Sequence, residues 1–85
     1  MEILVISPLA YALENQTSKV QEKLFVENLT DCRIHKVQAL PDEYEEKING
    51  HQYDYMWIDT LYSSAEVGRM REHLSGLQSK QIERF

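Results

Sequence analysis

Short aliphatic or aromatic runs alternate along the chain with longer segments whose apolar residues recur at helical spacing. Residues 3–6 form a continuous aliphatic run, which is typical of a strand that is covered on both faces. Residues 53–60 are rich in aromatic and β-branched residues, which favours a second strand of this kind. Residues 32–40 predict another strand, although Ile34 and Val37 are out of phase for strict alternation.

Amphipathic segments follow each of these runs and predict three helices: residues 17–29, 41–50 and 63–76. Thr17 or Ser18 is expected to cap the first helix, and Pro41 suits the first turn of the second. Ser63 and Glu66 have the spacing of a capping box, which marks the start of the third helix. The third helix has the clearest apolar stripe, formed by Val67, Met70, Leu74 and Leu77.

The alternation of strands and helices predicts a single three-layer α/β domain over residues 1–85. Right-handed crossovers then give a parallel sheet of three strands in the order 2-1-3. Residues 81–85 would add a fourth strand at the edge of the sheet, or else remain unpaired. Ligands of such sheets bind at the carboxyl ends of the strands, so candidate functional residues are sought there.

Composition and charge narrow the range of partners. The chain has 9 Lys and Arg against 14 Asp and Glu, a net charge of −5, which argues against direct binding to nucleic acid or to anionic membranes. Its apolar runs are too short to cross a membrane, and no signal segment is expected. The single Cys32 cannot form an internal disulfide, which suits a cytoplasmic protein.

The loop after the first strand carries a resemblance to a known family. Tyr11 to Ser18 resembles the Cys-x-x-Gly-x-x-Thr-Ser loop of enzyme IIB domains of the sugar phosphotransferase system, with Thr17–Ser18 matching. Tyr11 and Glu14 stand where that family has the phosphate-carrying cysteine and the glycine. The resemblance therefore implies a flavodoxin-like, IIB-like domain without phosphotransfer. It is similar to the module at the end of Mga/AtxA-type transcriptional regulators, for which self-association and regulation are implied.

A second resemblance concerns the third predicted strand. Residues 52–59 look like the third strand of two-component receiver domains, which places Asp59 at the phosphoacceptor position. A receiver also needs an acidic pair after its first strand to hold Mg²⁺, and Ser7–Pro8 stands there instead. We therefore expect Asp59 to be a solvated carboxylate that caps backbone N–H groups, and we keep a phosphoacceptor role as an alternative.

Other reactive side chains predict no chemistry. The three histidines fall on three different predicted elements, so no metal site is expected from His35, His51 and His73. Cys32 is expected to be a small apolar residue, and the serines near strand ends are expected to cap helices or turns. No catalytic residue, cofactor or metal is therefore predicted.

Two surfaces remain as candidates for binding a protein. Five apolar or aromatic residues fall in the two predicted loops at the carboxyl ends of the first and third strands, and they form either a covered edge of the core or an exposed binding patch: Leu9, Tyr11, Leu13, Leu61 and Tyr62. A cluster of acidic residues surrounds Tyr44 and could dock a basic partner: Asp42, Glu43, Glu45 and Glu46. The sequence favours a non-catalytic interaction module that binds a protein partner or a second copy, with a small acidic inhibitor as another alternative.

Overall fold

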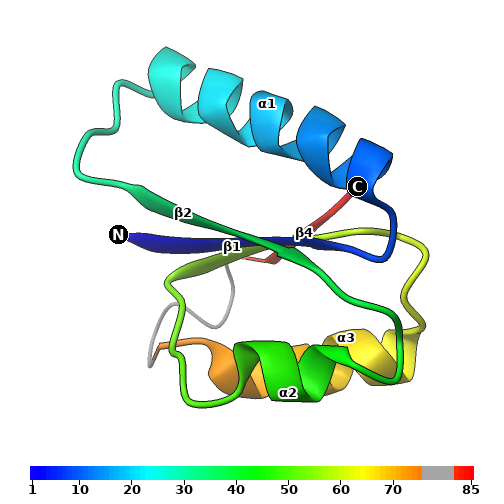
Figure 1. Ribbon diagram of the computed structural model, residues 1–85. Helices are drawn as coiled ribbons and strands as arrows, with labels where there is room; N and C mark the ends of the chain where they lie inside the picture. The colour runs from blue at the N-terminus through cyan, green and yellow to red at the C-terminus, as the bar shows by residue number, and fades with distance from the viewer. Residues whose placement is uncertain (76–81) are drawn as a thin grey trace.

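The computed structural model describes residues 1–75 and 82–85. Strands and helices alternate along these residues as the sequence predicts (Figure 1). The elements are β1 (Glu2–Ser7), α1 (Ala10–Val26), β2 (Arg33–Gln38), α2 (Tyr44–Ile48), β3 (Tyr55–Ile58), α3 (Ser64–Met70), the 3₁₀ turn η1 (Arg71–His73) and β4 (Ile82–Arg84).

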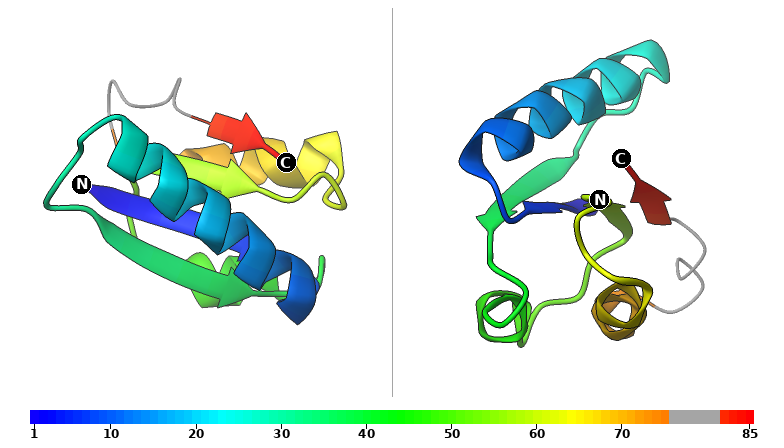
Figure 2. Two further views of the ribbon diagram at one scale, coloured as in Figure 1. Left: turned by 90° about the horizontal axis from the view of Figure 1, so that it is seen from above. Right: turned by 90° about the vertical axis from the view of Figure 1, so that its right-hand side faces the viewer.

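The strands form one parallel sheet in the order β2-β1-β3-β4, which confirms the predicted topology and adds the fourth strand at the edge. Helix α1 covers one face of the sheet, and α2 and α3 lie side by side on the other (Figures 1 and 2). The chain is therefore a small flavodoxin-like α/β domain of three layers. Its central strand β1 is buried along nearly its whole length, as the continuous aliphatic run predicts.

Apolar side chains pack on both faces of the sheet. On the α2–α3 face, Leu4 and Ile6 of β1 join the larger cluster, whereas Ile3 and Val5 face α1. Ile34 packs in the α1 layer and Val37 in the opposite layer, because residues an odd number apart in a strand point to opposite faces. Their apparent fault in alternation thus reflects a strand that contributes to both layers.

Helix α1 begins at least eight residues before the expected start. Ala10 is its first residue and Leu9 is the N-cap, so Thr17 lies inside the helix rather than at its cap. The Thr17 hydroxyl donates a hydrogen bond to the carbonyl of Leu13, at 2.7 Å. A threonine hydroxyl can find its hydrogen-bond acceptor in this way within a helix. This explains why Thr17 was wrongly predicted to be the N-cap.

The third helix starts as predicted and ends early. Ser63 and Glu66 form the predicted capping box, but α3 ends at Met70 and η1 follows it. Leu74 is buried as the stripe predicts, yet it forms a parallel bridge with Tyr53 instead of extending the helix. The predictions for Gly76, Leu77 and Gln81 lie outside the described residues.

Candidate functional site

A buried carboxylate lies where the carboxyl ends of β1 and β3 meet. Asp59 follows β3 directly, and its side chain is only 4% exposed. Its Oδ2 accepts hydrogen bonds from the Ser7 hydroxyl at 2.6 Å and from Gln16 Nε2 at 3.2 Å. Its Oδ1 accepts from the backbone N–H of Leu61 at 2.9 Å. We call Ser7, Gln16 and Asp59 the polar triad.

The prediction for Asp59 was half right. Its carboxylate caps a backbone N–H group, as expected, but it is buried rather than solvated. The cause is the early start of α1, which places Gln16 over the strand ends where the sequence predicted a loop. Both carboxylate oxygens already accept hydrogen bonds, and a phosphoacceptor needs an accessible oxygen. The geometry therefore lends the phosphoacceptor alternative no support.

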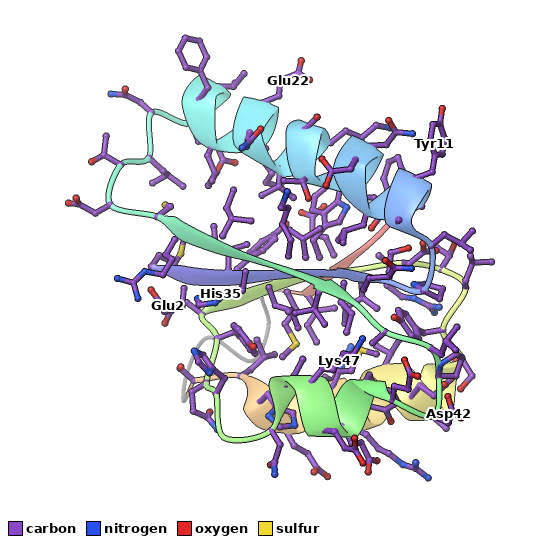
Figure 3. The ribbon with its side chains drawn as sticks, viewed as in Figure 1. Glu2, Tyr11, Glu22, His35, Asp42 and Lys47 are labelled. Atoms are coloured by element: carbon purple, nitrogen blue, oxygen red, sulfur yellow. The ribbon has the colours of Figure 1, made fainter. Side chains whose placement is uncertain are left out.

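The expected apolar patch divides into an exposed part and a buried part. Tyr11 is 81% exposed and projects from the first turn of α1 (Figure 3), and Leu9 and Leu61 are each more than half exposed. Leu13 and Tyr62, at 7% and 1% exposed, belong to the core, so they form the covered edge and not an exposed surface. Leu13 is buried because it lies on the inner face of α1 and not in a loop.

Tyr62 is held inside by its hydroxyl group. The hydroxyl donates a hydrogen bond to the carbonyl of Ala39, and the ring packs edge-on against Tyr44. Burial, together with the nearby carboxylate of Asp59, raises the pKa of Tyr62 well above its ordinary value. The side chain is thus a neutral structural phenol that joins the end of β2 to the loop after β3.

Sequence analysis missed one member of the exposed patch. Leu40 follows β2, the neighbour of β1 in the sheet, and half of its surface is exposed. Its place at the carboxyl end of a predicted strand was the signal that could have identified it. We call Leu9, Tyr11, Leu40 and Leu61 the apolar rim, because they follow the carboxyl ends of three adjacent strands.

The polar triad anchors the backbone of the apolar rim. The Ser7 hydroxyl donates to Asp59 and also accepts a hydrogen bond from the backbone N–H of Leu9, at 3.1 Å. Asp59 in turn accepts from the backbone of Leu61. One buried carboxylate thereby fixes the two loops from which Leu9 and Leu61 project. On the outer side, Arg84 donates to the carbonyl of Tyr62 at 2.7 Å and secures the same loop.

The acidic cluster lies on and before α2, on the opposite layer from α1. Asp42, Glu45 and Glu46 are exposed, whereas Tyr44 is buried, so no aromatic ring accompanies the charges at the surface. Basic neighbours offset part of the cluster: Lys47 lies 3.8 Å from Glu43, and Arg69 lies 3.4 Å from Glu45. These are exposed pairs, and they reduce the net charge that a basic partner would meet.

Cys32 lies as the sequence predicts, whereas two of the three histidines lie closer together than expected. Cys32 is half-buried and packs beside the α1 layer, which fits the small apolar role expected of it. His35 and His51, although they come from different elements, lie together with ring centroids 5.0 Å apart. His73 touches the same region through its Nδ1, which is 3.2 Å from the carbonyl oxygen of His51.

A cavity of about 450 Å³ lies between α1 and the strands β3 and β4. Its walls are mostly apolar, and the ion pair between Lys23 and Glu83, at 2.7 Å, forms part of its lining. This pair lowers the pKa of Glu83 and raises that of Lys23 through their hydrogen bond. The polar triad and the apolar rim do not line this cavity.

Comparisons with known proteins add no assignment: the chain matches no protein-family model, no curated protein and no solved structure. Among the residues that the structure describes, none of the helices has the length and apolar character needed to span a membrane.

Proposed function

We propose that the chain is a non-catalytic interaction module that self-associates through its apolar rim, as part of a cytoplasmic regulatory system. The observation that carries the proposal is the set of four large apolar side chains exposed at the carboxyl ends of adjacent strands. Aromatic and aliphatic anchors of this kind are frequent at the centres of protein interfaces.

The charge distribution favours a second copy as the partner. Two copies of a chain with net charge −5 repel each other over most of their surface. Two of the segments that form the rim are an exception, because residues 7–13 and 60–65 contain no charged side chain, whereas Leu40 is followed closely by Asp42 and Glu43. A twofold interface brings the same patch from each copy together, and an uncharged patch can do so without like-charge repulsion.

Hydrogen bonds from the polar triad already order the backbone of the apolar rim before binding. The polar triad fixes the backbone on both sides of the patch, so association need not order these loops. The regulatory role rests on the resemblance to IIB-like modules of transcriptional regulators, and the cytoplasmic setting on the lone cysteine.

The test is sedimentation equilibrium over a wide range of concentrations. We expect the wild-type chain to form a dimer, and Tyr11→Ser and Leu61→Ser to shift the equilibrium towards the monomer. Phe25→Ser is the matched control, because Phe25 is 86% exposed at the other end of α1, about 21 Å from Tyr11 by helical rise. A strictly monomeric wild type, or a dimer that only Phe25→Ser disrupts, would contradict the proposal.

A further inference from the structure

Three side chains that can bind a metal ion meet at the amino end of the sheet, opposite the apolar rim. Glu2 is the first residue of β1, His35 lies in the neighbouring strand β2, and His51 follows α2. Their ligand atoms all lie within 4.8 Å of one another. Figure 3 shows Glu2 and His35 close together at this end of the sheet.

Buried neighbours hold the two imidazoles in place. The ring of Tyr53, which is almost fully buried, stacks on His51 at 5.5 Å and meets the edge of His35 at the same distance. The imidazole of His35 also donates a hydrogen bond from Nε2 to Glu2 Oε1, at 2.8 Å. Both imidazole rings therefore pack against the buried ring of Tyr53, and the imidazole of His35 already faces the carboxylate of Glu2.

The backbone around the cluster is also cross-linked. Glu2 and Asp54 exchange two hydrogen bonds, from the Glu2 N–H to Asp54 Oδ2 and from the Asp54 N–H to the Glu2 carbonyl. The N–H of Tyr53 donates to the carbonyl of His73 at 2.7 Å. These contacts bind the segment that carries His51 to the start of β1, so the three donors are held near one another by the fold.

We propose that Glu2, His35 and His51 bind a divalent transition-metal ion of the zinc type. Two imidazole nitrogens and one carboxylate oxygen form a donor set that suits Zn²⁺ and its late first-row neighbours. Ligand bonds of about 2.0–2.1 Å separate tetrahedral donors by roughly 3.3 Å, so the cluster must close by about 1–1.5 Å. His51 is exposed and lies in a loop, so its side chain can make that movement.

The metal ion would take the place of the proton on His35 Nε2, and the neutral imidazole ligand would then carry its one proton on Nδ1 after exchange with solvent. Three protein ligands leave a fourth position for water or another exchangeable ligand. Arg33 opposes the cation, because its guanidinium lies 4.0 Å from Glu2 Oε1. Removing that charge with Arg33→Gln should therefore tighten binding.

The experiment is a titration with Zn²⁺ alone, measured by calorimetry and by competition with a chromogenic chelator. We expect one ion per chain, and an affinity that falls at least about tenfold in His51→Gln and in Glu2→Gln. His73→Gln is the matched control, since the His73 side chain hydrogen-bonds to the backbone carbonyl of His51 and is not one of the three proposed ligands. Its affinity should equal that of the wild type.

A second measurement needs no variant. Substoichiometric Zn²⁺ should shift the imidazole NMR signals of His35 and His51 and leave those of His73 in place. Absence of binding by the wild type, an equal loss in His73→Gln, or shifts that miss His35 and His51 would each overturn the proposal. The site lies at the opposite end of the sheet from the apolar rim, so these outcomes are independent of self-association.

Discussion

The polar triad should contribute measurably to stability, and replacement of Asp59 tests this. Asp59→Ala removes an acceptor that two buried donors use, the Ser7 hydroxyl and Gln16 Nε2, together with the backbone of Leu61. A buried donor that loses its acceptor lowers the free energy of unfolding by about 1–3 kcal/mol, and the loss of a hydrogen bond to a charged group is at the upper end of that range. We therefore expect Asp59→Ala to lower the free energy of unfolding by about 3–5 kcal/mol.

Asp59→Asn should be milder. The asparagine Oδ1 can still accept from Leu61, and its new NH₂ group faces Gln16. Gln16 Oε1 is buried without a hydrogen-bond partner among the described residues, so a rotation of the Gln16 amide can offer it as the acceptor. The Ser7 hydroxyl proton and the Gln16 NH₂ group then lose their acceptor, but Gln16 Oε1 gains a donor, and the expected cost is about 1–2 kcal/mol.

The assay is urea unfolding followed by the fluorescence of Trp57, the single tryptophan, which is buried two residues before Asp59. An 85-residue domain has roughly 4–13 kcal/mol of stability in total, so the loss in Asp59→Ala is large enough to measure. Asp42→Ala, at an exposed site, should change stability by less than about 0.5 kcal/mol. Equal losses in Asp59→Ala and Asp59→Asn, or a loss in Asp59→Ala no larger than in Asp42→Ala, would refute the reasoning.

Two further predictions concern the helix cap and an ion pair. Ser63→Ala breaks the capping box and should cost about 1 kcal/mol of unfolding free energy by urea unfolding, whereas the adjacent Ser64→Ala should cost little. The Lys23–Glu83 pair depresses the pKa of Glu83, so its contribution is present above the ordinary value of 4.5 and is lost as the pH falls through the folded-state value. Because both side chains are partly exposed, this contribution is only about 0.5 kcal/mol. When unfolding is measured at pH 6 and at pH 3, the wild type should therefore lose more stability between the two pH values than Lys23→Gln does. Equal losses in the two proteins would contradict a stabilising Lys23–Glu83 pair.

Much of the fold could be predicted because local signals agreed with it. The aliphatic run in β1 and the capping box before α3 each have a single physical explanation, and both were confirmed. The start of α1 could not be predicted in the same way. Leu9 is the N-cap although it makes no side-chain hydrogen bond there. Thr17 is a residue type favoured at N-caps, but it lies inside the helix and donates its hydroxyl to the Leu13 carbonyl. Tertiary packing, and not local propensity, decides where this helix begins.

That single error affected the prediction of the site. A loop over residues 8–16 would have exposed Leu13 and left Asp59 in water, whereas the helix buries both. The meeting of His35 and His51 depends on how strands and loops pair in three dimensions, which spacing along the chain does not show. Glu2 lies on the same face of β1 as Leu4, and Leu4 pairs with His35, but this pairing is visible only in the structure.

The polar triad also selects one alignment of the strands. A slip of β3 along β1 by two residues would keep every side chain on its own face, so the alternation of faces alone does not fix the alignment of the two strands. The Ser7 hydroxyl and the Asp59 carboxylate meet only in the observed alignment, and any slip would bury the charge without its partners. The buried carboxylate at one end of these strands and the Glu2–Asp54 hydrogen bonds at the other thus favour the same single alignment.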